Sequence, residues 1–137
     1  MIHSSYDSAL VRREIRSVGI VSNGVNTARR LAWRFVESGF ETESYDLIQC
    51  FGNLSGMFSD EHLVVVDLGW TEAEIERSME FLFKISDQES RPKIVVLVPQ
   101  LEPESRPLWS ELGVFLALDR TTAPPEIMAR ILQHPWI

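Results

Sequence analysis

The sequence predicts a doubly wound α/β fold: a three-layer α/β/α sandwich whose central sheet has five parallel strands in the order 2-1-3-4-5. Two observations lead to this prediction. Along the 137 residues, five short stretches typical of strands alternate with five stretches typical of helices. Two of the strand-like stretches, at 63–66 and 94–98, are continuous apolar runs, which are typical of strands covered by helices on both faces. Right-handed crossovers between such strands make 2-1-3-4-5 the usual order at this length.

The length and composition predict one domain with a full hydrophobic core, at 16–137, preceded by a polar tail or short extra helix at 1–15. The formal net charge is −7, so we expect no direct nucleic-acid binding by this domain. We expect no membrane association, because no apolar run is long enough to cross a bilayer and the N-terminus lacks a secretory signal. A single cysteine, Cys50, forms no disulfide framework and suits the cytoplasm.

The first half of the chain predicts three strands and two helices. Residues 17–22 are apolar and precede an Asn-Gly turn. The next helix has apolar residues at helical spacing and ends at Gly39. Gly52 and Gly56 weaken the second helix, which we expect to be short. In order, the elements are a strand at 17–22, a helix capped by Asn26 or Thr27, a less buried strand at 41–45, a short helix within 47–58 and the buried strand at 63–67.

The second half predicts two strands and three helices. Thr71 and Glu74 have the spacing of a capping box, which opens a helix that ends near Ser86. Pro103 and Pro107 make the following helix late-starting or irregular. In order, the elements are a helix from Thr71 to Ser86 with Ile75, Met79, Leu82 and Ile85 on its inner face, a strand at 94–98, an irregular helix within 101–112, a strand at 114–118 and a helix at 124–133.

Asp67 is the first candidate for a functional residue. It ends the third predicted strand, and ligands of open α/β sheets bind just beyond the carboxyl ends of the strands. Other chemistries have little support. Cys50 follows the second strand and is expected to be a small core residue. The three histidines, His3, His62 and His134, show no ligand spacing, so we predict no metal site and no cofactor.

Three segments, in register with one another, resemble the receiver domain of bacterial response regulators. They are Ile20-Val21-Ser22-Asn23 through Arg29-Arg30 to Gly39-Phe40, the segment from Val64 to Gly69, and the segment from Gly113 to Ile127. The last of these is most similar to receivers attached to LuxR-type DNA-binding domains. The resemblance covers about residues 16–132 and places Asp67 at the phosphoacceptor position.

Two departures from this resemblance concern the metal. Receivers use acidic residues at the end of the first strand to hold Mg²⁺, which neutralises charge during phosphoryl transfer. The corresponding residues here are Ser22 and Asn23, and neither carries a charge. With Asp67 as the only anionic ligand, we expect Mg²⁺ binding to be weak or absent.

Further departures concern the phosphoryl contacts and the switch. The receiver's hydroxyl residue at the end of the fourth strand falls on Val98, which cannot donate a hydrogen bond. The lysine after the fifth strand falls on Arg120, whose planar guanidinium differs from a compact ammonium. The switch aromatic falls on Ala117, and the proline that follows the acceptor strand falls on Thr71.

These departures favour an atypical receiver, or pseudo-receiver, in which Asp67 is a structural carboxylate held by Arg120 or by backbone N–H groups. Such a domain would not be an enzyme and would act by protein–protein contact, independently of phosphorylation. The first alternative is a conventional phosphoacceptor at Asp67, assisted by Arg120 and Asn23. The second alternative is a small-ligand sensor that uses the polar crevice of Ser22, Asn23, Asp67 and Arg120.

Large aromatic residues provide candidates for the contact surface. Trp33 lies off the apolar stripe of its helix, Trp109 lies on the irregular helix, and Trp136 is near the C-terminus. The simpler interpretation for each is that it folds over the edge of the core. Receivers commonly dimerise through their fourth helix, fifth strand and fifth helix. The resemblance thus implies a homodimer or protein partner at 101–112, 114–118 (with Ala117) and 124–133, and an output such as transcription.

Overall fold

A five-stranded parallel sheet forms the centre of the molecule. The computed structural model describes residues 17–51, 63–87 and 92–133. The strand order is β2-β1-β3-β4-β5, which confirms the predicted topology. The strands are β1 (Ser17–Ser22), β2 (Glu41–Asp46), β3 (Leu63–Asp67), β4 (Lys93–Val98) and β5 (Leu116–Asp119). Outside the described residues lie the predicted tail at 1–15, Gly52, Gly56 and the rest of 52–58, His3, His62, His134 and Trp136.

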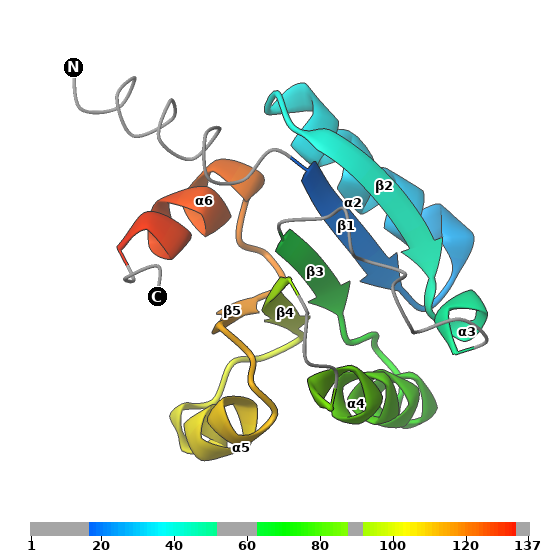
Figure 1. The fold of residues 1–137 in the computed structure, drawn as a ribbon, viewed down its shortest axis with the longest axis vertical. Helices are drawn as coiled ribbons and strands as arrows, with labels where there is room; N and C mark the ends of the chain where they lie inside the picture. Colours follow the sequence, from blue (N-terminus) through cyan, green and yellow to red (C-terminus); the bar gives the residue numbers. More distant parts are fainter. Residues whose placement is uncertain (1–16, 52–62, 88–91, 134–137) are drawn as a thin grey trace.

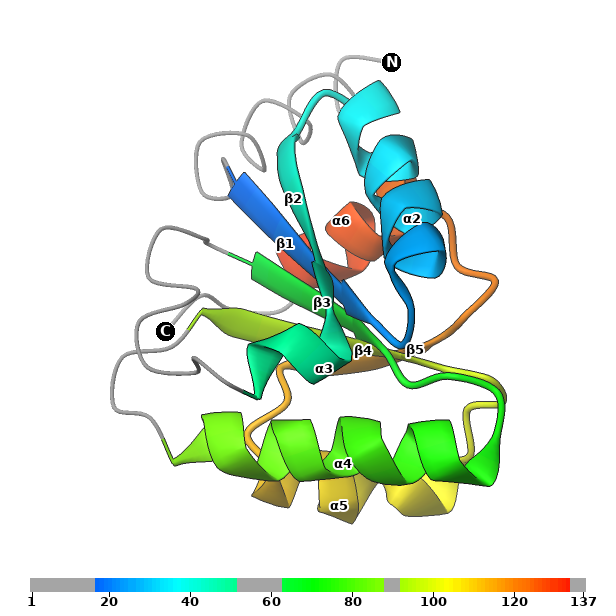
Figure 2. The same cartoon turned by 90° about the vertical axis from the view of Figure 1, so that its right-hand side faces the viewer.

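Helices cover both faces of this sheet (Figures 1 and 2). One face carries α2 (Val25–Glu37) and α6 (Pro124–Leu132). The other face carries α3 (Leu47–Cys50), α4 (Glu72–Ser86) and α5 (Arg106–Glu111), and a 3₁₀ turn at Pro103–Ser105 precedes α5. None of the helices within these described ranges is long and apolar enough to cross a membrane.

Alternate residues of each central strand enter two separate hydrophobic cores. On β3, Leu63 and Val65 pack in the core beneath α2 and α6, whereas Val64 and Val66 pack in the core beneath α3, α4 and α5. All four side chains are fully buried. The continuous apolar run at 63–66 therefore reflects two covered faces, as expected for a central parallel strand.

The starts of the two long helices differ in how they are capped. The prediction that Asn26 or Thr27 caps the first helix is wrong, because α2 begins at Val25 with Gly24 as its N-cap and no side-chain cap. Gly24 has φ of +102°, which lets the chain turn directly from β1 into the helix. At α4 the predicted capping box is present: the Glu74 backbone N–H donates to Thr71 Oγ1 at 3.1 Å.

The predicted inner face of α4 is partly correct. Leu82 and Ile85 are buried, whereas the predicted pair Ile75 and Met79 is only partly buried. Phe81 and Ser78 are fully buried, and the apolar pattern did not identify them. The helix is therefore rotated slightly relative to the prediction, so that a serine faces the loop after β3.

The region of the two prolines is irregular, as predicted, but one detail is corrected. The fifth strand runs from Leu116 to Asp119 instead of over 114–118. Trp109, a candidate for the contact surface, instead follows the simpler interpretation of a ring folded over the core: it is 8% exposed, packs in the core beneath α5 and donates its Nε1–H to Ser105 Oγ at 2.9 Å. Trp33, by contrast, is exposed on α2.

Candidate functional site

The carboxyl ends of the central strands bring the predicted site residues to one edge of the sheet. They are Ser22 at the end of β1, Asn23 directly after it, Asp67 at the end of β3, Val98 at the end of β4 and Arg120 after β5. Of these, only Asp67 and Arg120 contact each other through their side chains, by hydrogen bonds and an ion pair, and the Arg120 backbone N–H donates to the Val98 carbonyl. Ser22 and Val98 are buried.

Asp67 and Arg120 form a nearly buried ion pair. The Oδ1 atom of Asp67 accepts from Arg120 Nε at 3.0 Å, from Arg120 Nη2, and from the backbone N–H of Gly69 at 3.1 Å. Arg120 Nη2 also donates to the Gly69 carbonyl at 2.6 Å. The exposed fractions of the two side chains are 13% for Arg120 and 8% for Asp67, so solvent screens their attraction weakly. The carboxylate is thus bound by a guanidinium through one oxygen.

Trp70 covers the face of the same guanidinium. The Cζ atom of Arg120 lies 3.9 Å from the centroid of the Trp70 ring, which is within the range of a cation–π contact. Trp70 itself is 72% exposed, so the ring lies on the surface with Arg120 beneath it. Sequence reasoning missed Trp70. The available clue was a large aromatic directly after the glycine turn that follows Asp67.

Asn23 is bound to the loop after β3 and to α4. Its Nδ2 donates to Ser78 Oγ at 2.9 Å and lies 3.4 Å from the carbonyl oxygens of Leu68 and Glu74. The Ser78 hydroxyl lies 2.9 Å from the same two carbonyl oxygens. The Oδ1 atom of Asn23 is buried and has no donor among the described residues. Asn23 therefore links the turn after β1 to the start of α4, and it makes no hydrogen bond to Asp67.

Gly69 permits this close packing. Its φ is +98°, and a Cβ at this position would lie 2.6 Å from Glu74 Cβ and 3.1 Å from Asn23 Nδ2. Only glycine fits both the backbone conformation and the space. The turn therefore delivers the Gly69 N–H to Asp67 and the Gly69 carbonyl to Arg120.

Two carboxylates near the site have lowered pKa values. Backbone N–H groups of Thr71 and Trp70 donate to Glu74 and lower the pKa of its carboxyl. The backbone N–H of Thr121, and then its hydroxyl, lower the pKa of Asp119. Cys50 is different: burial, and secondarily the charge of Asp46, raise the pKa of its thiol to about 12. Cys50 lies in the core beneath α3, as expected for a small core residue.

Comparisons with solved structures identify the architecture. A CheY-like response regulator receiver domain protein from Methanospirillum hungatei JF-1 superposes with a TM-score of 0.65 at 14% identity, covering 87% of this chain and 92% of that one. The non-phosphorylated HemR receiver domain from Leptospira biflexa gives a TM-score of 0.65 at 18% identity, with coverage of 89% and 99%. This chain has the receiver-domain fold. A response regulator from Thermotoga maritima, with a TM-score of 0.64, 17% identity and coverage of 87% and 96%, has the same receiver fold. No protein-family model matches the chain, and a search of curated proteins gives no significant sequence match.

Within this receiver fold, the residues at the carboxyl ends of the strands offer few suitable ligands for Mg²⁺. A hard divalent cation prefers several oxygen ligands with negative charge. Here Ser22 and Asn23 are neutral, and one oxygen of Asp67 is already bound by the cation of Arg120. In the described part of the chain, no three or more His, Cys, Asp or Glu side chains are grouped to hold a metal ion.

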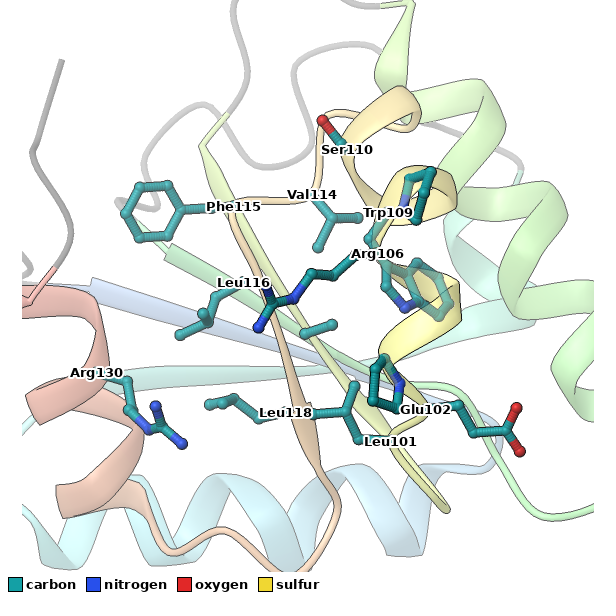
Figure 3. Close-up of a pocket in the computed structure, with 13 residues that line it drawn as sticks. Leu101, Glu102, Arg106, Trp109, Ser110, Val114, Phe115, Leu116, Leu118 and Arg130 are labelled. Carbon is teal, nitrogen blue, oxygen red and sulfur yellow. The ribbon is translucent and has the colours of Figure 1, made fainter.

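A groove of about 750 Å³ runs along β5, at the edge of the sheet, between α5 on one face and α6 on the other. In Figure 3, Arg106 extends from α5 over the strand, and Arg130 extends from α6 toward Leu118. Leu101 also lines the groove and is 41% exposed. Ala117, at the predicted switch position, is half-buried in the floor of the groove. The groove is thus an apolar floor with an arginine on either side.

Proposed function

We propose that this chain is an atypical receiver, or pseudo-receiver, that works by protein–protein contact without phosphorylation of Asp67. In this proposal it regulates an attached or partner output such as transcription. The observation that carries the proposal is the ion pair in which Arg120 binds Asp67 Oδ1 through two nitrogens. The resemblance of the segment from Gly113 to Ile127 to LuxR-type regulators supports a transcriptional output.

Electrostatics make phosphorylation unfavourable at this site. Transfer of a phosphoryl group to a carboxylate requires neutralisation of the negative charge that both partners bring, which receivers achieve with Mg²⁺. The residues at the metal positions, Ser22 and Asn23, supply no charge. The guanidinium of Arg120 is a cation, but it is already bound to the Asp67 carboxylate, to the Gly69 carbonyl and to the Trp70 ring. Nε and Nη2, the two nitrogens that bind Asp67, would have to leave these partners to neutralise a phosphoryl group on the Asp67 carboxylate.

A conventional phosphoacceptor is the second candidate. It is favoured by one observation: all the hydrogen bonds to the Asp67 carboxylate within the described residues go to Oδ1, and none goes to Oδ2. The second oxygen therefore has no donor that would block attack on phosphorus. In that function Arg120 would stabilise the phosphorylated carboxylate in place of the usual lysine.

One experiment separates the two candidates. The protein is incubated with acetyl phosphate, and separately with beryllofluoride, each with and without Mg²⁺, and intact mass and tryptophan fluorescence are recorded. Asp67→Asn is the control. We expect no phosphoadduct and no Mg²⁺-dependent change in fluorescence. An adduct, or a Mg²⁺-dependent change that Asp67→Asn abolishes, would show that Asp67 is a working acceptor and that the pseudo-receiver proposal is wrong.

The proposed contact surface is the groove along β5 with the adjoining faces of α5 and α6. A shallow groove with an apolar floor and an exposed leucine at its margin is suited to a second copy of this chain or to another protein. This is the surface that receivers commonly use to dimerise. Trp109 is buried and cannot contact a partner directly, so we choose the exposed Leu101 for mutation.

Leu101→Asp tests this surface in solution. If the groove mediates self-association, sedimentation velocity will show a shift toward monomer in this variant. The matched control is Phe83→Asp, which places the same charge at an exposed apolar position of α4, away from the groove. If Leu101→Asp and Phe83→Asp leave the association state equally unchanged, the groove does not mediate a homodimer.

A further inference from the structure

A second cavity lies on the opposite side of Asp67 from α4, against α2. Its volume is about 260 Å³. Residues of α2 form one wall, and the ion pair with its covering ring forms the other. The lining residues are Thr27, Arg30, Leu31, Arg34, Asp67, Trp70, Leu97 and Arg120. The cavity is distinct from the groove along β5, with which it shares no lining residue.

The cavity is positively charged within an acidic chain. Three of its lining residues, Arg30, Arg34 and Arg120, are arginines, and Asp67 is the one carboxylate among them. Arg120 already neutralises Asp67, and within the described residues neither Arg30 nor Arg34 has an ion-pair partner. Two guanidinium groups therefore remain uncompensated at one concave site, although the whole chain has a formal charge of −7. Clustered cations in a concave site concentrate anions there.

Arg120 has one donor nitrogen that no described residue satisfies. Its Nη1 is buried and has no acceptor among the described residues, whereas Nε and Nη2 are used by Asp67 and Gly69. A buried charged donor without an acceptor is unfavourable, and such groups usually meet a water molecule or a ligand. Trp70 covers this guanidinium and is 72% exposed, so a small movement of the ring would admit an acceptor without disturbing the core.

We propose that this cavity binds a small phosphate-bearing anion, held between Arg30 and Arg34 on α2 and Nη1 of Arg120. Guanidinium groups pair with phosphate oxygens through two parallel hydrogen bonds, and three guanidinium groups that line one cavity match a multiply charged phosphate better than a single carboxylate. The volume of 260 Å³ accommodates a phosphate or pyrophosphate group with little more than a small substituent. Binding would connect α2 to the loop after β5 and to Trp70.

This proposal is independent of the proposed function. The binding is non-covalent and needs neither Mg²⁺ nor a reactive carboxylate. A failure to bind anions would leave the pseudo-receiver proposal intact, and a phosphoadduct on Asp67 would leave the anion site intact. The two experiments also use different readouts, since one follows covalent mass and the other follows reversible binding.

The test uses pyrophosphate as the probe. The whole chain is titrated at low ionic strength without Mg²⁺, and heat of binding and tryptophan emission are both measured. We expect saturable binding of one pyrophosphate per chain that weakens as salt is added. Replacing one charge-assisted partner, in Arg30→Gln or Arg34→Gln, should weaken binding roughly 10-fold or more. Trp70→Phe should remove most of the change in emission while binding is retained.

The matched control is Arg29→Gln. Arg29 is an exposed neighbour on the same helix, so this variant loses the same charge, but Arg29 does not line the cavity. Its affinity for pyrophosphate should change less than about 3-fold, because only the long-range field is altered. No saturable binding, or an equal loss of affinity in Arg29→Gln and Arg30→Gln, would overturn the proposal. Circular dichroism of each variant checks that α2 is intact.

Discussion

Arg120 reaches across the end of β4 to bind Asp67, which ends β3, so two strands that are not neighbours are joined at their carboxyl ends. The Arg120 backbone N–H also donates to the Val98 carbonyl at 2.8 Å, which fixes the arginine against the end of β4. One residue after β5 therefore closes the edge of the sheet where receivers conduct their chemistry. The same contact that argues against phosphorylation is a structural bond of the fold.

Arg120→Ala should destabilise the protein by about 3 kcal/mol, because it leaves the Asp67 carboxylate buried and without its cation. Asp67→Asn should cost less, since the amide oxygen still accepts from the Gly69 N–H. The double variant should be less destabilised than the sum of the two single variants, which gives a coupling energy of about 1–3 kcal/mol. Urea unfolding of the four proteins measures this coupling.

The pair Glu80–Lys84 on α4 is the reference for that measurement. Its atoms lie 3.5 Å apart at i,i+4 spacing, and both side chains are more than half exposed. Solvent screening limits such a pair to about 0.5 kcal/mol or less. Equal coupling energies for the buried and the exposed pairs would mean that Arg120 does not hold Asp67 in solution.

Gly69→Ala should be more destabilising than Gly24→Ala. Both glycines have positive φ, at +98° and +102°, so each alanine imposes backbone strain of about 2 kcal/mol. At Gly24 the new Cβ meets nothing within 4 Å, whereas at Gly69 it would overlap Glu74 Cβ at 2.6 Å. The overlap should add about 2 kcal/mol. Urea unfolding gives the loss in free energy of unfolding for each variant, and the difference between the two losses measures the steric overlap apart from the backbone strain. Equal losses would rule out the tight packing at Gly69.

Glu74→Gln should lower stability at pH 7 by about 0.5 kcal/mol, since glutamine can still accept from the Trp70 and Thr71 N–H groups but lacks the charge that favours a helix N-terminus. The folded-state pKa of Glu74 is lowered, so its contribution is complete above the ordinary value of about 4.3 and is lost as the pH falls through the folded-state pKa. Urea unfolding from pH 7 to pH 3 should show the two proteins converging at the acidic end.

Glu76→Gln is the matched control for the pH series. Glu76 is exposed on the same helix and makes none of the capping contacts. Its substitution should change stability less than Glu74→Gln at pH 7, because no hydrogen bond to the capping N–H groups is altered. A gap between wild type and Glu74→Gln that persists at pH 3 would show that the capping charge is not its origin.

Apolar patterning was sufficient to predict the sheet. Runs such as 63–66 have both faces covered, and this restricts them to central strands of a parallel sheet whose order follows from chirality. The Asp67–Arg120 contact could be anticipated, because parallel strands end at one edge and opposite charges there attract. For Trp109 the sequence left two alternatives, the core edge and a contact surface, because Pro103 and Pro107 break the helical period by which an inner face is recognised.

The conformations of the loops could not be predicted from the sequence. The position of Trp70 over Arg120 depends on the positive φ of Gly69, which sets the direction of the chain after β3. The cavity beside α2 depends on side chains that are far apart in sequence, Arg30 and Arg120, and on the depth of the gap between them. Helical spacing places the basic residues of α2 off its apolar stripe but carries no information about what they face.

Cys50 should be unreactive toward thiol reagents in the native protein. It is fully buried, and burial, with Asp46 as a smaller cause, raises the pKa of its thiol to about 12. The thiolate is the reactive species, and a raised pKa of the Cys50 thiol means that less thiolate is present. With a pKa of about 12, only about one thiol in 10,000 is ionised at pH 8. Labelling with a disulfide reagent at pH 8 should be slow in buffer and fast in concentrated guanidinium chloride.

Asp46→Asn distinguishes the two causes of this low reactivity. If burial dominates, the variant will stay nearly as slow as wild type, because the thiol is still enclosed beneath α3.

The raised pKa of Cys50 also makes the stability of the protein depend on pH. The thiol of the unfolded chain ionises near pH 8.5, whereas the thiol of the folded protein ionises only near pH 12. The contribution of Cys50 to stability therefore declines as the pH rises from about 8.5 toward 12. Cys50→Ala should lack that part of the alkaline decline. Rapid labelling of the native protein at pH 8 would show that the core beneath α3 opens far more often than its packing implies.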